Sequence, residues 1–261
     1  MRRSLLALSL LVFGHVGAAS AAMVAKPVQW TDQGVTYKSF LVYDDAVTAK
    51  RPGLLMVPNW FGVNDMAVAK AKEIAGKDYV ILLTDMYGGG IRPTSEAEAG
   101  AAVKPLYADR KVMRERVSRA FEELKSQARQ APIDPARLAA IGFCFGGSAV
   151  LDLARSGANV AAVVSFHGIL STDDPKLASN IHAKVLALNG ADDASVPAEQ
   201  RAAFEAEMRG GKVDWASEDF GGAVHCFTEK EATAATGNCR YDAKVAHRAY
   251  AAMRSWLGEA F

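Results

Sequence analysis

The sequence predicts an α/β protein with a mostly parallel sheet and helices on both faces. Short apolar runs alternate along the chain with stretches whose apolar residues recur at helical spacing, which is the pattern of strands joined by crossover helices. Half of the 261 residues are hydrophobic, so the chain can bury one sizeable core. A strand-like run also enters a glycine-flanked turn, Gly142 to Gly147, from which a helix leaves. These observations predict a single domain over residues 34–261.

Residues 1–21, ahead of this domain, are predicted to be a cleaved signal peptide. Arg2-Arg3 form a positive start, Leu5 to Phe13 is a short apolar run, and Ala19-Ser20-Ala21 resembles an A-x-A cleavage site. The run is shorter than a membrane-spanning helix requires. We expect cleavage after Ala21 or the next residue and export to the periplasm, with an uncleaved membrane anchor as the alternative.

The mature chain is expected to open with a loose lead-in, residues 22–33, before the regular elements. Strands are predicted at apolar runs bounded by turn residues: Val35–Tyr43 as an edge strand, Leu54–Val57, Tyr79–Leu83, Leu138–Ile141, Val160–Phe166, Val185–Leu188 and Val213–Ser217. Helices are predicted where capping residues precede amphipathic stretches: Met66–Gly76 after Asp65, a helix from Ser95, Asp109–Arg129, Ser148–Arg155, Ala198–Arg209 and Tyr241–Leu257. No long insertion follows the central strands, which predicts that there is no large lid domain.

The charge balance excludes some partners. The formal net charge is +1, which gives no electrostatic reason to expect nucleic acid or a charged membrane surface as a ligand. No segment after the signal peptide is apolar for long enough to span a membrane, so we expect no membrane association of the mature form. The sequence makes no prediction of oligomeric state.

The glycine-flanked turn carries a cysteine at its centre. Gly142-Phe143-Cys144-Phe145-Gly146 follows the pattern G-x-[S/C]-x-G of a nucleophile elbow, with cysteine in place of serine. The flanking glycines are required because a side chain there would collide with the neighbouring strand or helix. The thiol then lies at a helix N-terminus, where the helix dipole favours the thiolate. Cys144 is therefore the predicted nucleophile.

A cysteine nucleophile needs a base and an acid that orients the base. In the elbow fold these follow the nucleophile in the order acid, histidine. Asp192 and Asp193 lie in a loop after an apolar strand, and Asp193 has the usual placement of the acid, three residues before Val196-Pro197. His225 follows the last strand behind a glycine-rich loop. We expect a Cys144–His225–Asp193 triad, with an Asx-turn as the alternative role for either aspartate.

Export changes how the other two cysteines are interpreted. Cys226 and Cys239 lie either side of a polar loop rich in alanine, threonine and glycine. In an oxidising compartment their pairing is the simplest arrangement, and it leaves Cys144 free. The alternative is three reduced cysteines that pack as small hydrophobic residues.

Four motifs in order resemble those of the dienelactone hydrolase family of α/β-hydrolases, over roughly residues 30–258. They are the elbow, the loop Asn59–Asn64, the acid loop Gly190–Pro197, and His225-Cys226-Phe227. The resemblance implies the α/β-hydrolase fold and a carboxylic ester or lactone hydrolase of the carboxymethylenebutenolidase type, which acts through an acyl-cysteine on a small-molecule substrate. It calls for no metal and no organic cofactor. It also implies an oxyanion hole made by the backbone N–H groups of Phe145 and Trp60.

Two features depart from the well-known members of that family. Their glutamate beside the resting thiol is replaced here by Asn59. Of the arginines that hold the substrate carboxylate, one is replaced by Gly88-Gly89-Gly90 after Tyr87 and another by Glu229. Asn59 cannot accept the proton of the thiol, and Glu229 would repel an anionic substrate. Arg92 is a candidate replacement for the lost arginine. The resemblance therefore supports a hydrolase more strongly than it supports dienelactone as the substrate.

The substrate pocket is predicted to include Asn59 and the aromatic residues Phe61 and Tyr87. His167, which ends another strand, is a further candidate for this pocket. A rival hypothesis is a catalytically idle binding or structural protein on a hydrolase scaffold. Thiol–disulfide exchange is disfavoured, because the chain has no C-x-x-C motif.

Overall fold

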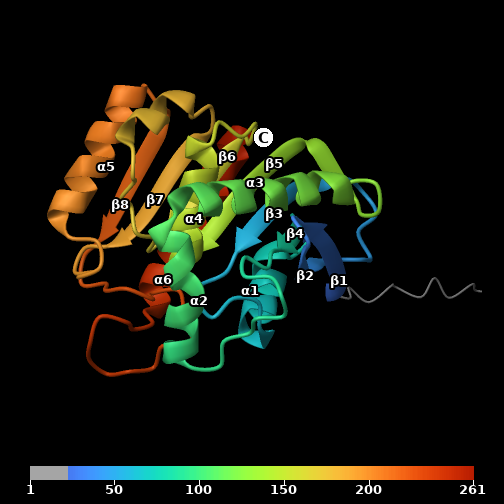
Figure 1. The fold of residues 1–261 in the computed structure, drawn as a ribbon, viewed down its shortest axis with the longest axis horizontal. Coiled ribbons are helices and arrows are strands. Elements are labelled where there is room, and N and C mark those ends of the chain that lie inside the picture. Colours follow the sequence, from blue (N-terminus) through green and yellow to red (C-terminus); the bar gives the residue numbers. More distant parts are fainter. Residues whose placement is uncertain (1–22) are drawn as a thin grey trace, which may run out of the picture.

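The protein folds around one eight-stranded sheet with the strand order β1-β2-β4-β3-β5-β6-β7-β8. The computed structural model describes residues 23–261, so the predicted signal peptide, residues 1–21, lies outside the described residues. β1 pairs with β2, and β2 with β4, in antiparallel orientation. All the other neighbouring strands, from β4 through β3 to β8, pair in parallel. Figure 1 shows the twisted sheet with helices packed against it. This is the predicted α/β-hydrolase architecture, and no large lid domain interrupts it within residues 23–261.

The bounds of the elements follow the apolar runs of the sequence. The strands are β1 Met23–Asp32, β2 Val35–Asp44, β3 Arg51–Val57, β4 Val80–Leu83, β5 Ile133–Phe143, β6 Ala162–Phe166, β7 Lys184–Gly190 and β8 Trp215–Phe220. The α-helices are α1 Asp65–Ala75, α2 Glu96–Ala108, α3 Arg110–Gln127, α4 Phe145–Arg155, α5 Ala198–Gly211 and α6 Ala243–Ala260, with a short 3₁₀ helix over Pro175–Asn180.

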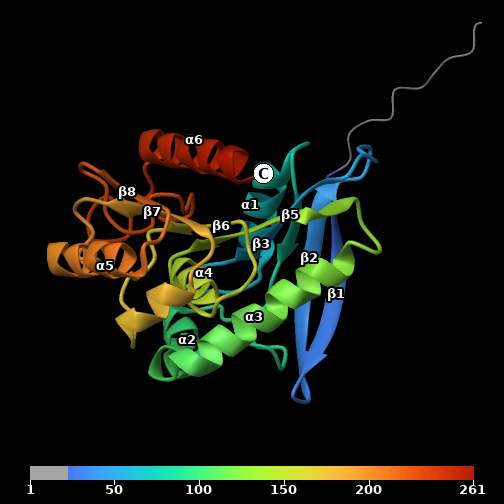
Figure 2. The ribbon, with the colours of Figure 1, turned by 90° about the horizontal axis from the view of Figure 1, so that it is seen from above.

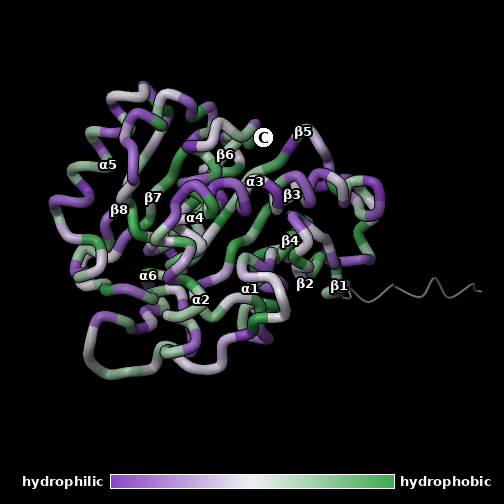
Figure 3. The backbone as a smooth tube through the Cα atoms, in the orientation of Figure 1, coloured by the Kyte–Doolittle hydropathy of each residue, from purple (hydrophilic) through white to green (hydrophobic). Residues whose placement is uncertain are grey.

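Helices cover both faces of the sheet, as predicted. Figure 2 shows α1 and α6 on one side and α2, α3, α4 and α5 on the other. Two apolar clusters match these layers, one under α1 and α6 and one under the remaining helices. The tube in Figure 3 is hydrophobic along the central strands, while the helices alternate between hydrophobic and hydrophilic residues. None of the described helices is both long enough and apolar enough to cross a membrane.

The N-terminal edge of the sheet corrects the prediction of a loose lead-in at residues 22–33. β1 occupies most of that segment and pairs with β2, so the Val35–Tyr43 strand is internal rather than an edge strand. A two-residue turn joins the strands, with positive φ angles at Gln33 (47°) and Gly34 (79°). Such turns match the twist of a hairpin, but their first residue is usually asparagine, aspartate or glycine. Glutamine at this position therefore gave no sequence signal of a turn. The stacking of Trp30 on Tyr37, with centroids 4.1 Å apart, adds a cross-strand contact.

Smaller corrections concern the ends of elements. Asn64, not Asp65, caps α1, because its side chain accepts a hydrogen bond from the Ala67 N–H. The helix from Ala198 runs through both glycines and ends at Lys212, which adopts the left-handed conformation. β8 begins two residues later than predicted and extends to Phe220. The longer strand places the following glycine-rich loop at the carboxyl end of the sheet, where parallel sheets bind ligands.

The nucleophile elbow joins β5 to α4. Cys144 has φ 52° and ψ −116°, a conformation that non-glycine residues rarely adopt. A Cβ atom on Gly142 would collide with the carbonyl oxygen of Gly146, and one on Gly146 would collide with the carbonyl oxygen of Val57 at the end of β3. The glycines therefore let the turn close tightly against its neighbours, as the sequence pattern predicts.

Replacing Gly146 with alanine should destabilise the fold by about 3 kcal/mol or more, because the colliding atoms belong to the backbone and cannot rotate away. Chemical denaturation of Gly146→Ala beside the wild type measures the loss. Gly258→Ala, in α6, is the matched control, since a Cβ there meets nothing within 4 Å and alanine favours the helix. Equal stability of Gly146→Ala and the wild type would contradict the close packing of the elbow.

Candidate active site

Cys144 is the one unpaired cysteine among the described residues, and it is partly exposed. It is the N-cap residue of α4, but its thiol makes no hydrogen bond to the helix backbone, so the thiol is available for chemistry at the positive end of the helix dipole. Its backbone N–H donates to the carbonyl oxygen of Phe166 at 3.0 Å and to Nδ1 of His167 at 3.2 Å. The elbow is therefore tied to the end of β6.

His225 and Asp193 meet beside the elbow, although they lie in different loops. Nδ1 of His225 is 2.7 Å from Oδ2 of Asp193, and Asp193 is only 2% exposed. Burial lowers the pKa of His225, but hydrogen bonds with Asp193 and Cys144 outweigh it and raise the pKa to about 10. At neutral pH the imidazole can thus hold a proton taken from the thiol. Asp192 is exposed and does not contact His225.

Asp193 is held as an acceptor on both of its oxygens. Oδ1 accepts from the backbone N–H of Ser195 at 2.8 Å and from Nδ2 of Asn238 at 3.1 Å. Burial raises the pKa of Asp193, but the hydrogen bond from His225 and those on Oδ1 lower it below its usual value. The acid therefore remains ionised and oriented toward the imidazole.

Asn238 is a site residue that the sequence did not reveal. It belongs to the loop closed by the Cys226–Cys239 disulfide, whose Cα atoms are 4.9 Å apart, and this bridge confirms the predicted pairing. Because Cys226 follows His225 and Cys239 follows Asn238, the predicted disulfide already placed Asn238 near the histidine. Its partner atoms on the acid loop could not be inferred from that proximity.

The two predicted oxyanion donors flank one tyrosine. The hydroxyl of Tyr87 donates to the carbonyl oxygen of Trp60 at 2.7 Å, and the Tyr87 ring stacks on Phe145 at 5.9 Å. Tyr87 is 6% exposed, and these contacts join the Trp60 loop to the elbow. Phe61 is partly exposed and packs edge-on against Trp60 at 5.6 Å. The N–H of Phe145 is the first of α4, which leaves it without an intrahelical acceptor.

His167 lies in the interior rather than in an open pocket. It is fully buried and has φ 40°. Its Nδ1 faces the Cys144 N–H and must accept, so its Nε2 carries the proton and donates to the Thr228 hydroxyl at 2.7 Å. Burial, followed by the charge of His225, lowers the pKa of His167 well below its usual value. A neutral imidazole is the form that this pattern of hydrogen bonds requires.

Two of the positions that depart from the resembled family contact each other. Nδ2 of Asn59 donates to Oε2 of Glu229 at 2.7 Å, and Oδ1 of Asn59 accepts from the Phe61 N–H at 3.0 Å. Oε1 of Glu229 pairs with Nζ of Lys70 at 2.6 Å, and it also accepts from the Thr228 hydroxyl. Asn59 is therefore fixed by the loop and by Glu229, and the charge of Glu229 is neutralised by Lys70.

Arg92 does not replace the missing substrate-binding arginine. Its guanidinium pairs with the buried carboxylate of Asp85 at 3.1 Å and donates to the Lys38 carbonyl oxygen at 2.7 Å. Asp85 in turn accepts from the backbone N–H groups of Tyr87 and Gly88. Arg92 thus stabilises the loop that carries Tyr87, and both terminal nitrogens of its guanidinium are engaged within the protein.

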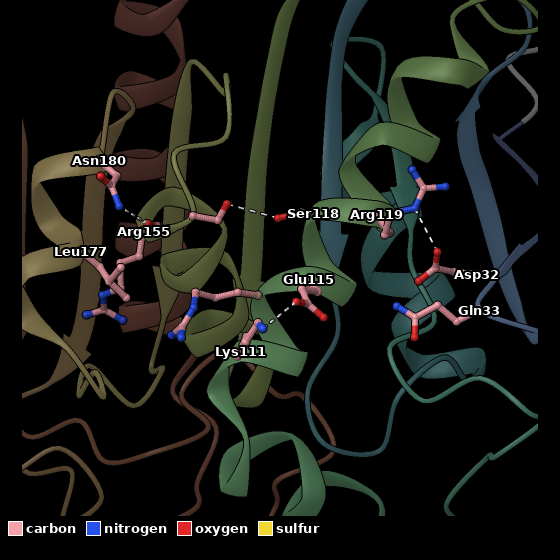
Figure 4. A pocket seen from close by; sticks show the side chains of 11 residues that line it. Asp32, Gln33, Lys111, Glu115, Ser118, Arg119, Arg155, Leu177 and Asn180 are labelled. Atoms are coloured by element: carbon pink, nitrogen blue, oxygen red, sulfur yellow. Dashed lines mark hydrogen bonds and ion pairs between the residues drawn. The ribbon is translucent and has the colours of Figure 1, made fainter.

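A cavity of about 470 Å³ lies away from this site, between the β1–β2 turn, α3 and α4 (Figure 4). All of its charged side chains are in ion pairs. Arg119 pairs with Asp32 at 3.2 Å and Lys111 with Glu115 at 3.8 Å, while Arg114 and Arg155 pair with acids outside the cavity lining. None of the triad residues lines it. The described residues also contain no cluster of histidine, cysteine, aspartate or glutamate that could hold a metal ion.

Comparisons with known proteins show which proteins this chain is similar to. A model of the dienelactone hydrolase family matches residues 38–261. A dienelactone hydrolase-like promiscuous phosphotriesterase from metagenomic libraries is 35% identical, with a TM-score of 0.85 over 93% of this chain and 100% of the other. A Bradyrhizobium protein named "Probable 2-oxo-3-(5-oxofuran-2-ylidene)propanoate lactonase" is 28% identical over 77% of this chain and 84% of its own length. An 18% identical dienelactone hydrolase from Anabaena variabilis, with a TM-score of 0.63 over 91% of this chain and 98% of its own, shares the fold.

Removing the Lys70 cation should destabilise the protein by about 3 kcal/mol, because it leaves the buried Glu229 carboxylate without a counter-charge. Lys70→Met keeps the apolar stem of the side chain, and urea denaturation measures the change. In Lys70→Met/Glu229→Gln the unpaired charge is gone, and most of the stability should return. A double variant no more stable than Lys70→Met would contradict the ion pair as the cause.

Proposed function

The chain belongs to the dienelactone hydrolase family and is an ester or lactone hydrolase, and from that premise we propose that it cleaves small substrates through an acyl-cysteine on Cys144. The observation that carries this proposal is the 2.7 Å hydrogen bond between His225 and the buried carboxylate of Asp193 beside the elbow. A raised His225 pKa suits a base that takes the thiol proton. The fixed carboxylate keeps the correct ring nitrogen toward Cys144.

The reaction follows from these contacts. His225 accepts the proton of the Cys144 thiol, and the thiolate sulfur attacks the carbonyl carbon of the substrate. The N–H groups of Trp60 and Phe145 stabilise the oxyanion that forms. When the tetrahedral intermediate collapses, His225 protonates the leaving alkoxide. A water molecule deprotonated by His225 then attacks the thioester, and the carboxylic acid leaves as the thiol regains its proton.

The charged groups near the site favour a neutral substrate. Lys70 is engaged by Glu229, and Arg92 is engaged by Asp85. Both acids are buried. If either cation moved away to bind a substrate, it would leave a buried carboxylate without a counter-charge, which is costly. A substrate that carries its own carboxylate would therefore find no free cation among these groups. We infer that neutral esters and lactones are hydrolysed better than anionic ones of the same size.

Phosphotriester hydrolysis is a second candidate activity. The 35% identical relative, whose whole length is covered by the match, is described as a promiscuous phosphotriesterase. The same groups could act on phosphorus. A thiolate attacks the phosphorus atom and displaces an alkoxide or phenoxide, and water then cleaves the P–S bond. The oxyanion donors would face the phosphoryl oxygen. Neutral phosphotriesters therefore belong in the substrate panel.

Cys144→Ala should lower kcat/KM for neutral aryl esters and lactones by about 10³-fold or more, because the nucleophile is removed. The panel pairs each neutral ester with an analogue that carries a carboxylate, and it includes an aryl phosphotriester. Activity is measured by release of the aryl alcohol or by proton release. Equal activity of Cys144→Ala and the wild type would contradict the proposal that Cys144 is the nucleophile. No activity in either protein would favour a catalytically idle protein on a hydrolase scaffold. Faster hydrolysis of the anionic analogues would refute the inference about charge alone.

We also propose that the protein is exported to the periplasm and cleaved after Ala21 or Ala22. The positive start, the short apolar run and the small-residue site support this, and the Cys226–Cys239 bridge suits an oxidising compartment. N-terminal sequencing of the protein from a periplasmic fraction should begin at Ala22 or Met23. Recovery of the uncleaved chain in the membrane fraction would instead favour the anchor.

A further inference from the structure

The disulfide encloses a loop that joins the catalytic histidine to the acid loop. Cys226 follows His225 directly, and Cys239 follows Asn238. A β-bridge pairs His225 with Cys239, and the Arg240 N–H donates to the His225 carbonyl oxygen at 3.0 Å. Most of residues 230–237, between the two cysteines, are exposed. The loop therefore has few packing contacts of its own. The disulfide and the β-bridge fix the position of its C-terminal end, next to Asn238.

Asn238 makes three hydrogen bonds to the acid loop. Its Nδ2 donates to Oδ1 of Asp193 at 3.1 Å and to the Ser195 hydroxyl at 2.9 Å. Its Oδ1 accepts from the Ala194 N–H at 2.9 Å. One side chain thus contacts three consecutive residues and fixes both the backbone of the acid loop and the rotation of the carboxylate.

We propose that Asn238 is a positioning residue for the catalytic acid, and that the Cys226–Cys239 disulfide holds it in place, so that reducing the disulfide lowers activity. This inference rests on the proposed function, because it takes Asp193 and His225 as the catalytic acid and base. Asn238 acts through Asp193 and touches neither the substrate nor the thiol in the proposed reaction.

The geometry of the carboxylate explains why a third residue matters. Asp193 must offer Oδ2 to His225, and its carboxylate can rotate about its terminal bond unless the other oxygen is also held. Oδ1 has two donors, the Ser195 N–H and Asn238. Of these two donors only Asn238 comes from outside the acid loop, so it joins Oδ1 to the disulfide-closed loop that follows His225. Hydrogen bonds from outside that hold a functional side chain in one orientation commonly determine its efficiency.

Reducing the Cys226–Cys239 disulfide is expected to displace Asn238 and to leave the three triad side chains chemically unchanged. A dithiol reductant transfers two electrons and two protons to the S–S bond, which yields two thiols on the protein and a cyclic disulfide of the reductant. Cys239 is exposed, so a small dithiol can reach the bridge. The bonds from the Arg240 N–H to His225 and from the Asp242 N–H to Phe227 do not involve the sulfur atoms. The reduced loop should therefore loosen at Asn238 while the histidine segment stays folded.

The first test compares Asn238→Ala and Asn238→Asp with the wild type. Alanine should lower kcat/KM by about tenfold or more, since a hydrogen bond to a charged group is lost. Aspartate keeps the size and the acceptor for Ala194, yet it loses the donor and adds a like charge, so it should be at least as impaired. Thr236→Ala, in the exposed part of the same loop, is the matched control and should behave as wild type.

The pH profile separates positioning from a purely structural role. The groups that face His225 are Asp193, the Cys144 thiol and the His167 ring, whose centroid is 5.1 Å away. If Asp193 loses its orientation in Asn238→Ala, its bond to His225 weakens, and the alkaline limb of kcat/KM should move to lower pH. A uniform loss with unchanged limbs would overturn the positioning role. Full activity of both Asn238 variants would also overturn it.

The second test treats the wild type and Cys226→Ser/Cys239→Ser with a dithiol, then removes the reagent and excludes oxygen. The wild type should lose activity to about the level of Asn238→Ala and recover on reoxidation, while the double variant should start at that level and not respond. Far-UV circular dichroism checks that both remain folded. A reduced, folded wild type with full activity would overturn the proposal. Cys144→Ala is assayed in parallel, because wild-type activity in that variant would mean that the proposed function fails, whatever the outcome at Asn238.

Discussion

The site depends on one hydrogen bond, the 2.7 Å contact between Nδ1 of His225 and Oδ2 of the buried Asp193. It raises the His225 pKa against the opposing effect of burial, and it decides which ring nitrogen faces the thiol. The two residues come from loops after different strands, so the fold must bring the loops together. Parallel strands do this because their carboxyl ends share one edge of the sheet. The disulfide and Asn238 then determine how closely the loops approach.

A second set of buried polar groups supports the other half of the site. It runs from the Cys144 N–H through His167 and Thr228 to Glu229, and from there to Asn59 and Lys70. The set links the elbow to the loop that offers the Trp60 N–H. Buried polar groups are costly unless each is paired, and here each of these side chains has a partner. Lys70 supplies the counter-charge of the buried Glu229 within this network.

The sequence predicted the fold and the pairing of His225 with Asp193 that the structure shows, because local patterns determine both. The glycines around Cys144, the strand before Asp193 and the turn before His225 each carry a local signal, and the order of the three residues is typical of the elbow fold. The hairpin at Gln33 was missed, because glutamine rarely takes a positive φ. Lys70, Thr228 and Asn238 were missed because their roles depend on side chains brought together only by folding. His167 lies at the end of a strand in sequence, but whether it faces the pocket or the interior depends on how the chain turns there.

The most direct test of the account is to locate the acyl group after reaction with a slowly hydrolysed ester. The wild type is quenched in acid within the first turnovers, and its intact mass and peptides are measured. One acyl group per molecule, attached to the peptide that contains Cys144 and absent from Cys144→Ala, is the predicted result. Turnover of the ester with no acylated protein, or an acyl group on another residue, would contradict the acyl-cysteine mechanism.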